Sequence, residues 1–109
     1  MLSVRFNQYK EHKKMNTVTL KNLRKDGNWT IGNAECEGME YKFNVKHFDD
    51  PSDYGIKDGR ISKLWLAPAN GNFRYTILLY DRKWERGCTT RGKGNAVKAV
   101  YNELLKRFN

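Results

Sequence analysis

The chain has 109 residues, with 21 lysines and arginines against 12 aspartates and glutamates, and its formal net charge is +9 at neutral pH. This length suits a single domain with one hydrophobic core. No apolar run is long enough for a membrane-spanning helix or a signal peptide, and two cysteines are too few for a disulfide framework or a zinc site. We therefore expect a cytoplasmic protein that needs no cofactor.

The positive charge is concentrated at the two ends of the chain. Residues 1–25 hold seven basic residues against one acid, and residues 61–109 hold ten against three, whereas residues 26–60 hold eight acids against four basic residues. A net charge this high favours an anionic partner, and its uneven placement predicts a local basic patch rather than a uniformly cationic surface.

Two segments precede the first clear hairpin. Residues 1–16 are polar and basic and are predicted to form an N-terminal arm, which leaves residues 17–109 as a single α+β domain. Residues 17–21 are predicted to form a short strand, and Asp26-Gly27 is a turn signal.

Residues 29–48 are predicted to form a hairpin with its turn at Glu37-Gly38. Apolar and polar residues alternate strictly over residues 39–46, which is typical of a half-buried strand. Pairing across this turn places small residues of the first strand beside large ones of the second, with Gly32 next to Phe43. A glycine there weakens its strand unless close packing or a bulge needs it.

Residues 60–84 are predicted to form a second hairpin, because two runs of β-branched and aromatic residues flank Asn70-Gly71. A two-residue loop at this point makes Ala69 face Asn72 and sets the register. One face of the hairpin then carries Leu64, Leu66, Tyr75, Ile77 and Leu79. The opposite face carries Ile61, Lys63, Trp65, Arg74, Thr76, Leu78, Tyr80, Arg82 and Trp84.

Loops are expected at residues 49–59 and 85–94, and the last segment is predicted to be a helix over residues 96–108 with Asn95 as its N-cap. The apolar residues of this helix recur at a spacing of three and four and form one stripe: Val97, Val100, Tyr101, Leu104, Leu105 and Phe108.

These elements predict an α+β fold: an antiparallel sheet of four to five strands, built from two hairpins, with the C-terminal helix packed on one face. One helix cannot cover both faces, so the other is expected to carry exposed aromatic and basic residues: Trp29, Lys42, Lys46, Lys63, Trp65, Arg74, Tyr80 and Trp84. Modules that bind single-stranded nucleic acid use such a surface, where rings stack on bases and cations follow phosphates. The alternative is that residues 1–25 cover these rings, or that the rings pair with each other across strands.

Residues 87–94 form a second candidate site, a flexible cationic loop that opens the helix. Backbone N–H groups at a helix N-terminus, with Arg91 and Lys93 beside them, suit an anion. The segment matches G-x-x-x-x-G-K, but Gly94 stands where a P-loop needs serine or threonine, so a nucleotide-hydrolysing site is rejected. A phosphate-contacting loop and a plain connector both remain open.

Few residues are suited to catalysis or metal binding. Four aspartates share residues 49–58 without metal-ligand spacing, so a solvated turn, or an acidic contact patch for a basic partner, is expected there. His12 lies in the arm, His47 ends a strand on the core side, and Cys88 has no identifiable partner for nucleophilic catalysis. We therefore predict a binding protein with no catalytic residue and no metal site.

Two resemblances add context. The pattern Pro51-Ser-x-Tyr-Gly-Ile, Gly59-Arg-Ile-Ser-Lys-Leu and Tyr80-Asp-Arg-x-Trp84, followed by a terminal helix, resembles an uncharacterised small-protein family of phages and mobile elements of Gram-positive bacteria. This resemblance covers roughly residues 28–109, implies an anti-CRISPR-like context and transfers no functional residue. Residues 91–98, at a helix start, resemble a double-stranded RNA-binding domain, in which lysines at this position contact phosphates across the major groove.

The sequence thus predicts a non-catalytic protein that engages nucleic acid or a host nucleoprotein. Its expected role is that of a phage-type inhibitor of a host nuclease, such as a CRISPR effector, in the host cytoplasm. The alternative is a protein–protein interaction module or a homodimer that uses the aromatic face. The residues expected to make the contacts are Lys63, Trp65, Arg74, Arg82, Trp84, Arg86, Arg91 and Lys93.

Overall fold

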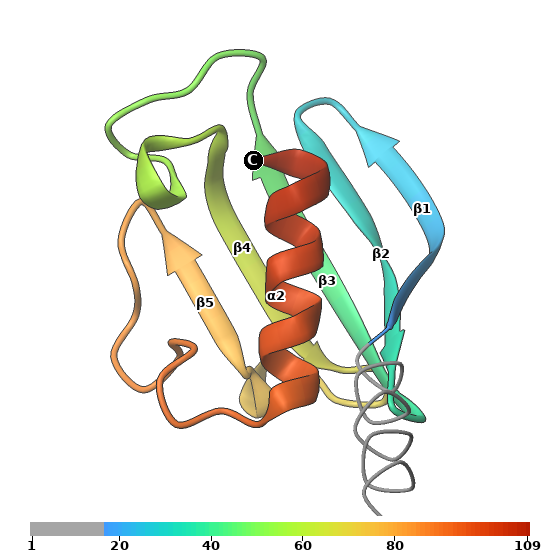
Figure 1. Cartoon of the computed structure of the whole chain (residues 1–109). Coiled ribbons are helices and arrows are strands. Elements are labelled where there is room, and N and C mark those ends of the chain that lie inside the picture. The colour runs from blue at the N-terminus through green and yellow to red at the C-terminus, as the bar shows by residue number, and fades with distance from the viewer. Residues whose placement is uncertain (1–16) are drawn as a thin grey trace, which may run out of the picture.

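The computed structural model describes residues 17–109, which form a five-stranded antiparallel sheet with one helix on one face (Figure 1). The strands are neighbours in chain order: β1 (Val18–Asp26), β2 (Trp29–Cys36), β3 (Met39–His47), β4 (Ile61–Pro68) and β5 (Leu78–Asp81). The helix is α2 (Asn95–Phe108). The predicted α+β fold is confirmed, and the predicted basic arm at residues 1–16 lies outside the described part of the chain.

The β2–β3 hairpin has the predicted turn and register. Glu37 and Gly38 both have positive φ values, 55° and 76°, as a two-residue hairpin loop requires. Gly32 pairs with Phe43, and a Cβ atom on Gly32 would lie 2.8 Å from Leu23 Cδ2. Leu23 is brought this close by a bulge in β1, where the pairing with β2 shifts between Lys21 and Arg24. The expectation that close packing or a bulge needs this glycine is confirmed.

The β4–β5 hairpin differs from the prediction. Neither Asn70 nor Gly71 has a positive φ. A two-residue loop would pair Leu66 with Tyr75, but Leu66 pairs with Leu78, three residues further along the chain. The connection instead contains the 3₁₀ turn η2 (Phe73–Tyr75), in which Arg74 N donates a capping hydrogen bond to Asn72 Oδ1 at 2.9 Å. An odd shift in register exchanges the two faces of a strand, so the predicted faces of β5 are wrong.

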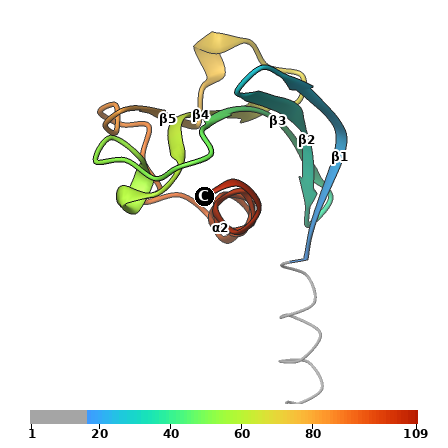
Figure 2. The ribbon, with the colours of Figure 1, turned by 90° about the horizontal axis from the view of Figure 1, so that it is seen from above.

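The hydrophobic core lies between the concave face of the sheet and α2, around which the strands curve (Figure 2). The predicted stripe of the helix faces this core, and Phe108 lies with its ring centroid 6.4 Å from that of Phe43 on β3. The prediction that Asn95 caps the helix is wrong. The helix begins at Asn95, and Gly94 occupies the N-cap position without a side-chain hydrogen bond.

His47 lies at the end of β3, at the margin of the core and on the core side of the strand, as predicted from the sequence. Its ring stacks on Phe108 with centroids 5.0 Å apart, and its Nε2 atom lies 2.9 Å from Thr30 Oγ1. Burial lowers the pKa of His47 below its usual value, and the positive charges of Lys25 and Arg60 lower it further.

The lowered pKa makes the stability of the fold depend on pH. The unfolded chain binds the proton of His47 more readily than the folded chain does, so the free energy of unfolding decreases as the pH falls from about 6.5 through the lower folded pKa. Urea midpoints measured between pH 7.5 and pH 5 should therefore fall, and His47→Gln should reduce that fall. Parallel pH profiles for the two proteins would contradict this assignment.

Candidate nucleic-acid interface

The sheet face opposite α2, here called the open face, is not covered by the helix. The sequence left residues 1–25 as a possible cover for this face; of these, residues 18–25 belong to the edge strand β1 and lie in the sheet itself, and residues 1–16 lie outside the described part of the chain. Strand alternation places on the open face Thr19, Lys21, Arg24, Asp26, Trp29, Ile31, Asn33, Glu35, Glu40, Lys42, Asn44, Lys46, Lys63, Trp65, Ala67, Leu79 and Asp81. In Figure 2 the segment between β4 and β5 rises from this outer side of the sheet, opposite α2.

A groove of about 480 Å³ runs across the open face. The residues that line it come from β2, β3, β4, β5 and the segment around η2: Trp29, Lys42, Asn44, Lys63, Leu64, Trp65, Asn72, Phe73, Leu79 and Tyr80. Most of this lining is aromatic or aliphatic, with two lysines and two asparagines among it. A volume of several hundred Å³ is typical of a small-molecule or single-nucleotide site rather than of a packing defect.

Two rings of the groove are held in a defined geometry. Trp65 is half-buried, and its Nε1 atom donates a hydrogen bond to Thr76 Oγ1 at 2.8 Å. Its ring stacks on Phe73, with centroids 6.4 Å apart and planes 14° from parallel. Phe73 is 68 % exposed, so this pair presents a wall of aromatic surface beside the groove. Trp29, at the start of β2, is also half-buried and lines the same groove.

Lysine ammonium groups stand beside these rings. Lys42 Nζ lies 5.7 Å from the centroid of Trp65, and Lys46 Nζ lies 5.9 Å from that of Trp29. Lys63 Nζ lies 3.6 Å from Asp81 Oδ1, and the ammonium group stays partly exposed. A cation at this distance from a ring is attracted to its face, which keeps the lysines close to the surface on which a base would stack.

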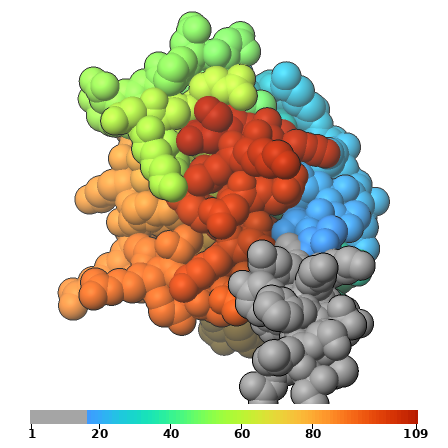
Figure 3. All heavy atoms as spheres, in the orientation of Figure 1, coloured from blue at the N-terminus to red at the C-terminus, as the bar shows by residue number. Residues whose placement is uncertain are grey.

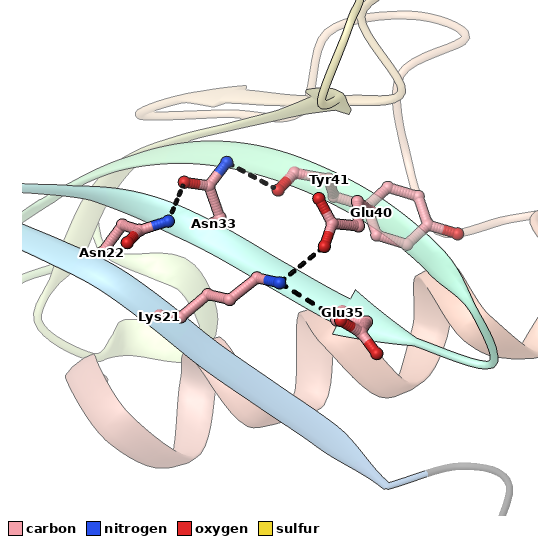
Figure 4. A network of polar contacts seen from close by, with 6 residues as sticks. All are labelled: Lys21, Asn22, Asn33, Glu35, Glu40 and Tyr41. Atoms are coloured by element: carbon pink, nitrogen blue, oxygen red, sulfur yellow. Dashed lines mark hydrogen bonds and ion pairs between the residues drawn. The ribbon is translucent and has the colours of Figure 1, made fainter.

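The opposite end of the open face carries no excess positive charge. Lys21 on β1 forms ion pairs with Glu35 and Glu40, at 3.2 Å and 2.5 Å, and Asn22 donates a hydrogen bond to Asn33 (Figure 4). The hydrogen bonds that Lys21 donates to Glu40 and Glu35 raise its pKa, so at neutral pH it is a protonated cation paired with two carboxylates. The open-face cations at the groove are Lys42 and Lys63, with Lys46 beside Trp29, and Arg24, which pairs with Ile31, is a further exposed cation on β1.

The predictions for Tyr80 and Trp84 on the open face are wrong. The register of β5 turns Tyr80 toward α2, where it is 7 % exposed and its hydroxyl donates to the backbone oxygen of Tyr54 at 2.8 Å. Trp84 contacts Tyr80 edge-on with ring centroids 5.2 Å apart and lies 5.7 Å from the ring of Tyr101 on α2. Trp84 is thus part of the core margin and does not contribute to the groove.

The other predicted basic residues are divided among three places. Arg74 is exposed on η2 next to Phe73, and Arg82 follows β5 with its guanidinium 5.7 Å from the ring of Tyr54. Arg86, Arg91 and Lys93 belong to the loop between β5 and α2, which lies along the β5 edge of the sheet (Figure 1 and Figure 3), where Leu79 N donates to the backbone oxygen of Cys88 at 2.9 Å. Of the predicted contact residues, the structure brings Lys63 and Trp65 together in the groove.

The loop between β5 and α2 does not form a closed cradle for an anion. Lys93 Nζ donates a hydrogen bond to the backbone oxygen of Gly87 at 3.1 Å, so this cation is occupied by its own loop. Arg91 is exposed, and its backbone N–H donates to Thr89 Oγ1. The phosphate-contacting role of this loop remains a prediction.

Sequence reasoning missed Asn72, Phe73 and Leu79 as groove residues. Each reaches the open face because the connection between β4 and β5 is a capped 3₁₀ turn rather than a two-residue loop. The available signal was Asn72 itself, since asparagine favours positions where its side chain can cap a backbone N–H.

Within residues 17–109, no group of three or more histidine, cysteine, aspartate or glutamate side chains is arranged to hold a metal ion. None of the helices in this part of the chain is long and apolar enough to cross a membrane.

Comparisons with known proteins identify one family. No curated protein and no solved structure matches the chain. The model of a family described as a domain of unknown function, DUF7678, matches residues 28–109, which include β2 to β5, the groove residues and α2. Because this match covers most of the chain, the protein belongs to the DUF7678 family.

Proposed function

We propose that the protein is a non-catalytic binding protein whose open face engages single-stranded nucleic acid, free or within a nucleoprotein. The observation that supports this proposal is the groove, in which Trp29, Trp65 and Phe73 stand beside Lys42 and Lys63. Proteins that bind single strands combine aromatic side chains, on which bases stack, with cations that follow the phosphates.

A single strand fits this surface better than a duplex. Bases in a double helix are stacked on each other and cannot offer their faces to a protein ring, whereas unpaired bases can be splayed out and stacked on aromatic side chains. The exposed ring of Phe73 and the half-buried rings of Trp29 and Trp65 offer such faces. Because stacking does not depend on base identity, we expect little sequence preference.

The resemblance to a small-protein family of phages and mobile elements gives the binding a narrower role. We propose that the protein inhibits a host nuclease, such as a CRISPR effector, by engaging its nucleic acid or the nucleoprotein that contains it. Inhibition of a purified effector by the protein, relieved by competing single strands, would support this role.

The salt dependence of binding tests the proposal. If the cations in and beside the groove together neutralise about three phosphates of a single strand, log K should fall with log salt at a slope of about −2, and affinity should fall roughly 20-fold between 50 and 200 mM salt. Fluorescence anisotropy of a labelled oligothymidylate measures this slope. A matched duplex should bind more weakly than the single strand. A flat response, or tighter binding of the duplex, would contradict the proposal.

One observation favours a second candidate, a protein–protein interface or homodimer. The groove is mostly apolar, and Phe73 and Tyr75 next to it are 68 % and 58 % exposed. Exposed apolar surface of this kind often marks an interface between proteins. Light scattering distinguishes the candidates, because a dimer through the open face predicts twice the monomer mass for the wild type and a monomer for Phe73→Asp.

A further inference from the structure

A second pocket, of about 390 Å³, adjoins the groove at the end of the open face that holds Lys63. Lys63 lines both the groove and this pocket. The other walls come from the end of β3, the β3–β4 connection and the residue after β5. The seven lining residues are Lys46, Phe48, Ser52, Tyr54, Ser62, Lys63 and Arg82. Three of the seven are cationic, and none is acidic.

Ser62 occupies a special position in this pocket. His47 pairs with Ile61 whereas Lys46 pairs with Lys63, so Ser62 is the extra residue of a β-bulge in β4. Bulges change the direction of a side chain and are common next to functional sites. The Ser62 side chain is buried, with the residue 7 % exposed, and its Oγ atom has no hydrogen-bond partner among the residues that the structure describes.

An unpartnered buried hydroxyl requires an explanation, because buried polar groups in folded proteins nearly always have a partner. Ser62 lines a pocket whose other polar groups are lysine, arginine and a second serine. The Ser62 hydroxyl is therefore a donor without an acceptor, in a place where three cations favour a negatively charged group. An anion with several oxygen atoms would satisfy the hydroxyl and the cations together.

The cations are held close to the pocket. Arg82 donates a backbone hydrogen bond to the oxygen of Ser62 at 2.9 Å, and its guanidinium lies over the ring of Tyr54. Lys46 Nζ lies 5.5 Å from the ring of Phe48. The acid nearest to a cation of the pocket is Asp81, at 3.6 Å from Lys63 Nζ, and it compensates one of the three charges.

The wall of the pocket formed by the β3–β4 connection is fixed by hydrogen bonds. Ser52 N donates to the backbone oxygen of Gly59 at 3.1 Å, and the Tyr80 hydroxyl holds the backbone oxygen of Tyr54. Tyr54 N donates to Ser52 Oγ at 3.3 Å, which leaves the Ser52 hydroxyl proton available as a further donor. The pocket is thus largely formed before any ligand arrives.

We propose that this pocket binds a phosphate group, with Arg82, Lys46 and Lys63 as its charge partners and the Ser62 hydroxyl as a neutral donor. Arginine and hydroxyl donors together suit a phosphate group, because a guanidinium group can donate two parallel N–H hydrogen bonds to two phosphate oxygens. We assign this phosphate to the backbone of a single strand whose bases stack in the groove, and this assignment rests on the proposed function. Lys63, shared by the two pockets, places the phosphate next to the rings.

The test compares two pocket variants with a matched control. Arg82→Gln removes a charge from the pocket, and Ser62→Ala removes the unpartnered hydroxyl. Arg107→Gln removes the same charge from an exposed position of α2 that does not line the pocket. We expect oligothymidylate affinity to fall about tenfold in Arg82→Gln and about fivefold in Ser62→Ala, because each loses a hydrogen bond to a charged acceptor. The control should change affinity less than twofold.

Amide NMR spectra titrated with inorganic phosphate provide the second measurement. Shifts at Ser62, Lys63 and Arg82 in the wild type, absent in Ser62→Ala and Arg82→Gln, support the phosphate site. If phosphate produces these shifts but no oligonucleotide binds, the site takes a free phosphate and the proposed function fails. If the oligonucleotide binds through Trp65 and both pocket variants behave like Arg107→Gln, the proposed function stands and the phosphate pocket is refuted. Ser62→Ala should melt at or above the wild-type temperature, so a loss of binding is not a loss of fold.

Discussion

Replacing Trp65 with alanine is expected to weaken the binding of a single-stranded oligothymidylate by about 5- to 150-fold, the range measured for losing one aromatic ring that stacks on a base. Trp65 lines the groove, its ring stacks on Phe73, and Lys42 Nζ lies 5.7 Å from its centroid. Fluorescence anisotropy at fixed salt measures the change. Trp65→Phe keeps a ring and should retain most of the affinity.

Controls separate this effect from a loss of structure. Trp65→Ala also removes the hydrogen bond to Thr76, so Thr76→Val tests the effect of losing that bond alone. Phe73 and Tyr75 belong to the same 3₁₀ turn and are both exposed, but Phe73 lines the groove and Tyr75 does not. Phe73→Ala should therefore weaken binding, and Tyr75→Ala should not. Unchanged affinity in a folded Trp65→Ala variant would show that the single strand does not bind in the groove.

Phe43→Ala is expected to lower the free energy of unfolding by about 3–5 kcal/mol, the usual cost of truncating a buried phenylalanine. Phe43 is fully buried in the middle of the concave face, and its ring contacts that of Phe108 on α2. Since small domains have about 5–15 kcal/mol of stability in total, the variant should be close to unfolding at moderate urea concentrations. Urea denaturation followed by circular dichroism measures the loss.

The matched change on the open face is Ile31→Ala. Ile31 lies on β2 but points away from α2 and is half-buried. We expect this substitution to cost about 1 kcal/mol, as is typical of sites outside a core. Similar losses for Ile31→Ala and Phe43→Ala would mean that both faces of the sheet are buried, and the open face would then not exist as a binding surface.

The β2–β3 hairpin and the helix were predictable because local signals and hydrophobic periodicity agree there. The strict alternation over residues 39–46 and the turn at Glu37-Gly38 point to the same register, and the structure has it. The stripe from Val97 to Phe108 allows one helix face to be buried, and this face packs on the sheet. These elements made the two-layer architecture, and the existence of an open face, predictable from the sequence.

The β4–β5 connection was not predictable from the same signals. Asn70-Gly71 is a strong hairpin signal, but a turn from Pro68 to Gly71 is followed by a 3₁₀ turn capped by Asn72, and this longer path moves β5 by three residues. Burial favours the observed register, because Leu78 lies in the core with no exposed surface. The change moves Tyr80 to the helix side and Leu79 into the groove. The bulge at Ser62 likewise depends on how β3 and β4 pair, which a single sequence does not show.

Mapping the binding surface by NMR tests directly whether the open face binds a single strand. Amide shifts are followed as a single-stranded oligothymidylate of about eight nucleotides, a typical site size for such surfaces, is added. If the strand binds to the open face, the largest amide shifts should occur at the open-face positions of β2, β3 and β4 and at Asn72 and Phe73, and the amide shifts of α2 should not change. Shifts confined to α2 and the loop before it, or no shifts at all, would contradict the claim that the open face binds a single strand.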